Sequence, residues 1–396
     1  MVAIFSSIPL FASIASPATS PKSNSSSLAV SCALSCSRTG FECVKQEVVG
    51  LRQLSVVRNS NQTQALAEST QMPDIPLLSC SEAIGRLRTY RESYKGQQQF
   101  LAMYSSIYGG ITTDSAAMVI PMDDHMVHRG HGVFDTAAII NGYLYELDEH
   151  LDRIIKSATM AKIGLPFDKE SMRSILIQTA SASKCREGTL RFWLSSGPGD
   201  FQLSPSACAP ALYAIVVQVQ SPADQKGVKV VTSSVPIKSP QFATMKSVNY
   251  LPNVLSKMEA EERGGFAAIW LDNEGYVAEG SNMNVAFVTK GKELLMPHFE
   301  KILSGCTAMR ILGLAEKLVK RGKLCGIRVG NITVKEGKQA DEMMLIGSGI
   351  LVRAVLQWDE QIIGNGQEGP VTKALLDLIV EDMKSGRHTV PILVAY

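Results

Sequence analysis

Two segments of the chain carry side chains suited to covalent chemistry at a carbonyl group. Lys246 lies in the segment Thr244–Leu255, and apolar neighbours such as Met245 and Val248 indicate that it is buried. Lysine is rarely buried without a purpose, and its amine can form a Schiff base with an aldehyde. Glu279 follows 33 residues later, in an expected turn before an apolar strand that would hold its carboxylate rigidly. We expect both side chains near strand ends. Alone, they could also be a surface lysine and a turn carboxylate.

Two glycine-containing segments could bind a phosphate group. The segment Ser304–Arg310 opens an expected helix, so its free backbone N–H groups could hold a dianion. Gly347-Ser348-Gly349 follows an expected strand and offers the Ser348 hydroxyl, although most glycine-rich turns are only turns. Arg153 offers a guanidinium that can bind phosphate through two hydrogen bonds, although a surface arginine on a helix would look the same.

Together these segments resemble the motifs of the fold-type IV enzymes that depend on pyridoxal 5′-phosphate (PLP), the class IV aminotransferases. The resemblance spans roughly residues 98–365. It implies that Lys246 forms the Schiff base with PLP and carries a proton between substrate and cofactor, and that Glu279 faces the pyridinium nitrogen. It also implies a set of residues at the PLP phosphate: Arg153, Cys306, Thr307 and Ser348. A scaffold that binds PLP without turnover is the alternative, and the intact motifs argue against it.

The resemblance covers three kinds of enzyme that share the lysine and the glutamate. These are D-amino-acid transaminases, branched-chain aminotransferases and aminodeoxychorismate lyases. Among these three kinds, the sequence as a whole most resembles the plant chloroplast D-amino-acid transaminases. This resemblance implies that the substrates are small molecules, namely D-amino acids and 2-oxo acids. Elimination of pyruvate from 4-amino-4-deoxychorismate, which leaves 4-aminobenzoate for folate, stays open as a second or main role. Branched-chain aminotransferase activity is a further alternative.

The expected substrate pocket departs from the bacterial pattern. The segment His128–Thr136 resembles the strand that lines the substrate pocket in the family, with Phe134 where bacterial D-amino-acid transaminases use a tyrosine. His131 stands where an aspartate is usual. The loop Ser196–Gln202 lacks the Arg-x-His pair that binds the substrate carboxylate in the bacterial enzymes. We therefore expect Arg353 to be the substitute cation for that carboxylate.

A histidine run invites a different interpretation. His125, His128 and His131 would share one face of a helix, and imidazoles are common zinc ligands. No cysteine or carboxylate cluster completes such a site, and Arg129 and Gly130 interrupt the run. We expect no metal centre here.

The composition is that of an ordinary globular protein. The 396 residues contain 45% hydrophobic and 19% charged side chains, and the formal net charge is +2, so the sequence implies no nucleic-acid partner. No stretch reaches 18 apolar residues, so we expect no membrane span. The eight cysteines are irregularly spaced without a CxxC motif, which favours reduced thiols over a disulfide framework.

The first 41 residues differ in composition from the rest. They contain no acidic residue, only Lys22 and Arg38 as basic residues, and 12 serines among the first 40 positions. An acid-poor, serine-rich start is typical of an organellar transit peptide, and we expect import into the plastid stroma, with the mitochondrion as the alternative. Residues 42–78 look poorly ordered because they include a polar tract at 59–64.

The remaining sequence predicts an α+β protein in two parts, 79–220 and 228–396. Apolar periodicity and capping residues predict helices at 79–93, 150–163, 171–183, 252–263, 307–321 and 370–384. Alternating and β-branched runs predict strands at 100–104, 117–121, 190–195, 212–220, 228–233, 267–271, 284–288, 343–346 and 351–358, with a hairpin at 139–145. The resemblance implies a small N-terminal α/β domain, a larger C-terminal pseudo-barrel domain, and a homodimer in which the partner's loop closes the pocket.

Overall fold

Two β-sheets with helices packed on them make up the part of the chain that the computed structural model describes, residues 74–93, 96, 98–219, 227–385 and 388–392. Residues 75–396 form one unit. The expected transit peptide and residues 42–73 of the expected poorly ordered segment lie outside the described residues.

The first sheet has seven strands in the order β16-β4-β3-β5-β6-β1-β2, and all pairings are antiparallel. Its strands are β1 (Gln98–Ser105), β2 (Gly110–Thr112), β3 (Gly132–Ile140), β4 (Tyr143–Tyr145), β5 (Gly188–Ser195), β6 (Ala211–Val219) and β16 (Thr389–Pro391). The last strand therefore returns from the far end of the chain to pair with β4.

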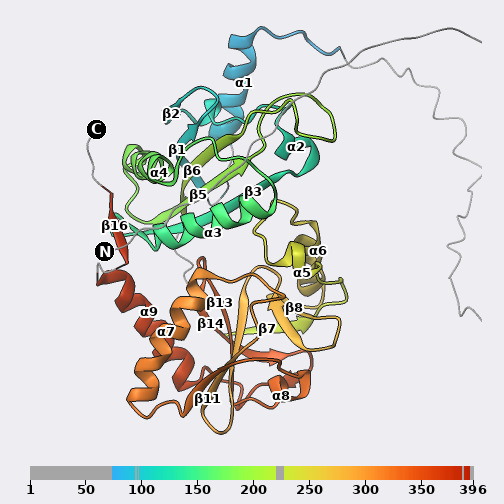
Figure 1. The fold of residues 1–396 in the computed structure, drawn as a ribbon, viewed down its shortest axis with the longest axis vertical. Helices are drawn as coiled ribbons and strands as arrows, with labels where there is room; N and C mark the ends of the chain where they lie inside the picture. Colours follow the sequence, from blue (N-terminus) through green and yellow to red (C-terminus); the bar gives the residue numbers. More distant parts are fainter. Residues whose placement is uncertain (1–73, 94–95, 97, 220–226, 386–387, 393–396) are drawn as a thin grey trace, which may run out of the picture. The chain divides into compact units, whose positions relative to one another are not determined.

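Helices cover one face of this sheet. The elements of this part are α1 (Cys80–Ser93), the 3₁₀ turn η1 (Ser115–Ala117), α2 (His125–Arg129), α3 (Leu147–Met160) and α4 (Lys169–Ser183). Alternate residues of β5, Leu190, Phe192 and Leu194, share one core cluster with Leu151 and Ile154 of α3. Every second side chain of the strand therefore packs against the apolar face of the helix. Figure 1 shows α3 running beside β3 and β5.

The second sheet has nine strands and mixes parallel with antiparallel pairs. Its main order is β12-β11-β10-β13-β14-β7-β8-β9, and β15 pairs with β14. The strands are β7 (Val228–Thr232), β8 (Ala267–Leu271), β9 (Val277–Gly280), β10 (Asn284–Val288), β11 (Glu293–Met296), β12 (Gly326–Val329), β13 (Glu342–Gly347), β14 (Leu351–Trp358) and β15 (Gln361–Ile362).

Both faces of the central strands in this sheet are buried. On β10, Val285 and Phe287 belong to one core cluster, whereas Ala286 and Val288 belong to another that includes residues of α7 and α9. The sheet thereby encloses an apolar interior on one side and carries a layer of helices on the other, which is the expected pseudo-barrel. The helices here are α5 (Pro240–Ala243), α6 (Leu251–Glu262), α7 (Cys306–Lys320), α8 (Val334–Lys338) and α9 (Pro370–Lys384).

Local sequence signals account for several element ends. Ser79 and Glu82 exchange hydrogen bonds at the start of α1, which confirms the predicted capping box. Asn141 and Gly142, with φ of 52° and 80°, form the tight turn of the predicted hairpin between β3 and β4. All six predicted helices are confirmed to within a few residues at each end.

Three predictions of local structure were wrong. The strand expected at 117–121 does not form, because η1 ends at Ala117 and the chain continues without regular structure. Lys246 does not lie at a strand end but in an irregular segment between α5 and α6. Glu279, expected in a loop, lies within β9, where the sheet fixes its backbone.

Among the described residues, we find no helix that combines the length and the apolar character required to span a membrane.

Candidate active site

The backbone around Lys246 is held by two elements of the first part of the chain. The Phe134 N–H of β3 donates to the Lys246 carbonyl oxygen at 3.0 Å, and the Val248 N–H donates to the Gly132 carbonyl oxygen at the same distance. The Lys246 N–H donates to the Ser157 hydroxyl oxygen of α3 at 3.2 Å. The irregular segment is therefore fixed as firmly as a strand, and the lysine has a defined position.

The electrostatic surroundings of Lys246 favour a neutral amine. Burial, together with the positive charge of Arg153, lowers the pKa of Lys246 to about 8, although Asp135 and Glu279 oppose the shift. Its Nζ lies 4.8 Å from the centre of the Phe134 ring, so an aromatic face replaces water on that side. A lysine with a lowered pKa is the form needed for nucleophilic attack on a carbonyl.

Glu279 is 6% exposed and lies near a second lysine. Burial raises the pKa of Glu279 to about 7, while the positive charge of Lys238 and the Leu303 N–H oppose the shift. That N–H donates to Glu279 Oε2 at 3.3 Å. Burial also lowers the pKa of Lys238, whose Nζ lies 5.1 Å from the centre of the Tyr250 ring. The Glu279 carboxyl group can therefore gain or lose a proton near neutral pH, depending on the charge of the group next to it.

The start of α7 forms a polar cradle on another side of the pocket. The first helical residue is Cys306, and Gly305 before it supplies no side-chain cap, so the N–H groups of the first turn remain available to a ligand. Thr307 Oγ1 and Ser348 Oγ lie 3.2 Å apart across this end of the helix. A Cβ atom at position 305 would lie 2.2 Å from Asn284 Oδ1, so the close approach requires glycine.

Arg153 is fixed beside this cradle by a buried network. Its Nε and Nη2 donate to the two carboxylate oxygens of Asp135 at 2.8 and 2.7 Å, and its Nη1 donates to the Ser304 carbonyl oxygen at 3.1 Å. His150 Nδ1 shares Asp135 Oδ1 at 2.7 Å. Burial alone would raise the pKa of Asp135, but Arg153 and His150 hold it far below its usual range. Burial likewise opposes the charge on His150, yet Asp135 and Cys306 raise its pKa to about 9.

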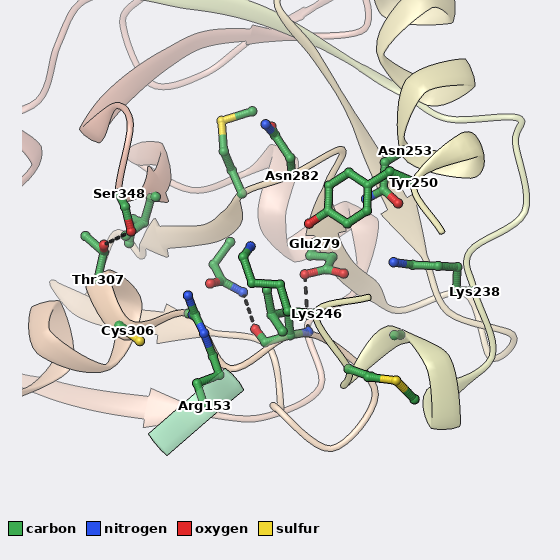
Figure 2. A pocket seen from close by; sticks show the side chains of 18 residues that line it. Arg153, Lys238, Lys246, Tyr250, Asn253, Glu279, Asn282, Cys306, Thr307 and Ser348 are labelled. Carbon is green, nitrogen blue, oxygen red and sulfur yellow. Dashed lines mark hydrogen bonds between the residues drawn. The ribbon is translucent and has the colours of Figure 1, made fainter. Parts of the chain in front are cut away.

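One pocket brings together most of the site residues predicted from the sequence. Figure 2 shows Lys246 between Glu279 on one side and the Thr307–Ser348 pair on the other, with Arg153 nearby. The predicted residues that line this pocket are Lys246, Glu279, Arg153, Cys306, Thr307 and Ser348.

The two predicted substrate-binding residues lie differently. Phe134 contacts the site through its ring, which faces Lys246 Nζ and packs edge-on against Tyr250 with 5.1 Å between ring centres. Arg353 lies on β14, and its guanidinium lies 4.4 Å from the centre of the Phe266 ring. Arg353 is not among the residues that line the pocket around Lys246. Its role at the substrate carboxylate stays a prediction.

Sequence reasoning missed several residues that line the pocket. They are Lys238, Tyr250, Asn253 and Asn282. Tyr250 and Asn253 directly follow the Lys246 segment, and that proximity was an available signal. Lys238 directly precedes Ser239-Pro240, and nothing in that turn-like segment indicates a buried cation.

The histidine run forms a network of its own. His125 Nδ1 and His131 Nδ1 lie 3.1 Å apart, and His131 Nε2 lies 2.8 Å from the Ala161 carbonyl oxygen. The His128 ring stacks on Phe201 of the 196–202 loop, with 4.7 Å between ring centres. Over the residues that the structure describes, no group of three or more side chains is arranged to hold a metal ion.

Comparison with known proteins agrees with this geometry. The family model described as Amino-transferase class IV matches residues 132–358, a range that contains each of the predicted site residues. The chloroplastic D-amino-acid transaminase of Arabidopsis thaliana is 64% identical over 330 residues, which cover 83% of this chain and 87% of that protein. The D-alanine aminotransferase of Bacillus licheniformis is 30% identical over 67% of this chain and 93% of its own length.

A solved structure supports the same assignment. The branched-chain amino acid aminotransferase of T.th., in complex with N-(5′-phosphopyridoxyl)-L-glutamate, superimposes with a TM-score of 0.68 at 25% identity, covering 74% of this chain and 99% of that one. The profile match, the two relatives and the shared fold lead to one conclusion: this chain belongs to the class IV aminotransferases.

Proposed function

We propose that the protein is a PLP-dependent D-amino-acid transaminase, which moves an amino group between D-amino acids and 2-oxo acids. The observation that carries this proposal is the 64% identity with a D-amino-acid transaminase over most of both chains. The pocket around Lys246 supports it, because a lysine with a lowered pKa, a buried carboxyl group and a helix N-terminus suited to an anion line one space.

The residues present fit the cofactor. PLP, when bound, supplies an aldehyde for amines and an aromatic ring that accepts electrons. The cradle at the start of α7 suits the phosphate, because it combines free helix N–H groups, the Thr307 and Ser348 hydroxyls and the nearby Arg153 guanidinium. Gly305 lets the start of this helix pack closely against Asn284.

The chain's own side chains would divide the work as follows. Lys246 would hold the cofactor through its aldehyde and, as a neutral amine, would move the proton at the substrate Cα. Glu279 would hold a proton at the ring nitrogen, and its buried position would prevent water from competing. The Phe134 and Tyr250 rings exclude water from the lysine side.

Lyase action on 4-amino-4-deoxychorismate is the second candidate. The loop 196–202 contains no arginine or histidine, so a carboxylate site built as in bacterial transaminases is absent from its sequence. That difference leaves room for a larger substrate with more than one acidic group. The same Lys246 and Glu279 would serve both reactions, so only the substrate assay separates them.

We further propose a plastid location and a homodimer. The relative from Arabidopsis is named chloroplastic, and the first 41 residues here contain no acid. The homodimer is supported by an exposed apolar face on α6, as a subunit interface would require. The side chains of this face are between 45% and 67% exposed, and they are Leu251, Val254, Leu255 and Met258. A reporter fused behind residues 1–75 should enter plastids, and the purified enzyme should sediment as a dimer. A cytosolic reporter or a stable monomer would contradict these proposals.

Three parallel assays test the main proposal. The purified protein with PLP is supplied with D-alanine and 2-oxoglutarate, with L-leucine and 2-oxoglutarate, and with 4-amino-4-deoxychorismate. We expect pyruvate formation from D-alanine at a kcat/KM well above the value for L-leucine. Dominant turnover of L-leucine would replace the proposal with a branched-chain aminotransferase, and dominant release of 4-aminobenzoate would replace it with a lyase.

A further inference from the structure

A second cavity lies next to the phosphate cradle. It lies between α3 and α7, has a volume of about 470 Å³, and shares Arg153 and Cys306 with the pocket around Lys246. We call it the α3–α7 cavity. The charged side chains along its wall include Glu146, Glu149 and Arg310. Ligands could therefore approach Cys306 without passing through the substrate side of the site.

One wall of this cavity contains a buried polar atom that lacks a partner. Glu146 is 4% exposed, and its Oε2 has no hydrogen-bond partner within the described part of the chain. Its backbone is fixed in the left-handed region, with φ of 51°, and its N–H donates to the His388 carbonyl oxygen at 2.8 Å. A buried carboxyl oxygen without a partner is costly, and a ligand that supplies an N–H donor would remove this cost.

The thiol at the inner end of the cavity lies beside a buried, charged histidine. Asp135 accepts from His150 Nδ1 at 2.7 Å, and His150 interacts electrostatically with Cys306. Cys306 is 9% exposed and is the first residue of the 15-residue helix α7. At this place a helix N-terminus and a positively charged histidine both stabilise negative charge on the sulfur during an exchange reaction. The role expected above for this residue, at the cofactor phosphate, makes no use of His150.

We infer that Cys306 is a covalent modification site for zwitterionic, amino-acid-derived disulfides that enter through the α3–α7 cavity. The mixture of charges in the cavity suits a zwitterion, because Glu146 and Glu149 can bind ammonium groups while Lys156 can bind a carboxylate. Arg310 is held by an ion pair with Asp382. Cystine is the simplest zwitterionic disulfide of this kind.

The reaction is a thiol–disulfide exchange. Cys306 loses its proton to solvent, and the thiolate, beside the positively charged His150, attacks one sulfur of the disulfide. The new S–S bond forms at Cys306 as the disulfide's own bond breaks, and the departing thiolate takes a proton from solvent. Cys306 is oxidised, one half of the ligand is reduced, and no further oxidant is required. The attached group occupies the cradle beside Thr307, so modification and binding of the PLP phosphate exclude each other.

Peptide mapping by mass spectrometry tests this inference on the full chain, with PLP removed or saturating. The protein is exposed to cystine and, separately, to bis(2-hydroxyethyl) disulfide, which is neutral. Without PLP, we expect cystine to modify Cys306 at least about tenfold faster than the exposed Cys325, and the neutral disulfide to lose that preference. Saturating PLP should protect Cys306 and leave Cys325 unchanged. This last arm rests on the proposed phosphate cradle, whereas the first does not.

Two neighbouring acids provide a matched pair of variants. Glu149 lines the cavity, whereas Asp148 pairs with Arg173 on the other side of α3 and does not line it. Glu149→Ala should slow the modification of Cys306 by cystine several-fold, and Asp148→Ala should leave it unchanged. Three results would overturn the inference: no cystine adduct on Cys306, equal rates with charged and neutral disulfides, or full modification in saturating PLP. Equal rates in both variants and the wild type would likewise exclude entry through this cavity.

Discussion

Thr307 and Ser348 bring their hydroxyl oxygens to within 3.2 Å of each other, although 41 residues separate them in the sequence. Thr307 belongs to the first turn of α7, and Ser348 belongs to the turn between β13 and β14. Two hydroxyls this close, next to the open end of a helix, can both donate to one anion. Their convergence is the geometric basis for assigning the phosphate cradle.

Replacing Thr307 by valine keeps the shape of the cradle and removes one donor. A hydrogen bond to a charged group contributes about 1.5–3 kcal/mol, so PLP should bind roughly ten- to hundredfold more weakly. Fluorescence titration of PLP measures the change. The control is Thr113→Val, at an exposed threonine that lines none of the pockets described above. Equal PLP affinity in the Thr307 variant and the wild type would remove Thr307 from the cradle.

Lys246 is predicted to carry the covalent link to PLP. Borohydride reduction of the enzyme with PLP should attach a pyridoxyl group to Lys246, and Lys246→Ala should lose both the label and at least about a thousandfold in kcat, as expected for a lost proton carrier. The matched control is Lys373→Ala, at an exposed lysine of α9. A label on any other lysine, Lys238 included, would refute the assignment.

The lowered pKa of Lys246 predicts how cofactor loading depends on pH. Only the neutral amine attacks an aldehyde, and Lys246 loses its proton near pH 8 rather than near its usual value of 10.5. The rate of PLP attachment to the cofactor-free protein should therefore rise about tenfold per unit below pH 8 and level off above it. Stopped-flow absorbance between pH 6 and 10 measures this profile. A rate that still climbs beyond pH 10 would show an unshifted lysine.

The same shift predicts an effect on the stability of the cofactor-free protein. Between pH 8 and 10.5 the unfolded chain binds more protons at this position than the folded chain, so the free energy of unfolding rises with pH across that window. Lys246→Met should remove this rise, which urea denaturation at pH 7.5 and 10 would detect. A variant that retains the full pH dependence of the wild type would assign it to other groups.

Arg153 and Asp135 form a pair whose two functions can be separated. Arg153→Met leaves the Asp135 carboxylate buried with His150 as its main partner, so the protein should lose about 3–5 kcal/mol of stability and also bind PLP more weakly. Adding Asp135→Asn removes the buried charge and should restore part of the stability but none of the PLP affinity. Urea denaturation and PLP titration measure the two effects. Recovery of affinity in the double variant would mean that Arg153 does not bind the phosphate.

The sequence predicted the elements better than it predicted the path of the chain around the site. The start of α1 could be predicted because Ser79 and Glu82 form a clear capping signal, and α3 could be predicted because its apolar stripe is regular. The setting of Lys246 could not, because its backbone partners, Phe134 and Ser157, lie about 90 to 110 residues earlier and no local periodicity reports them.

The site residues that could be predicted are those that lie within recognisable motifs, such as Lys246, Glu279 and Thr307. Lys238 escaped notice because its burial depends on Glu279 and Tyr250, which only the fold brings near it. Arg353 was predicted from its proximity to Ser348, and its role at the substrate carboxylate stays a prediction. It follows Ser348 by five positions on an expected strand, yet its guanidinium packs on Phe266 rather than lining the pocket around Lys246.

The pairing of β16 with β4 has a consequence for the order of events during synthesis. β4 lies next to β3, which carries Phe134 and Asp135, yet its outer edge is covered only when residues 389–391 have left the ribosome. Until then a nascent chain exposes an unpaired strand edge beside half of the future site. The first sheet thus begins before the second in the sequence and is completed only after it, so a chain still bound to the ribosome exposes an edge that chaperones can protect.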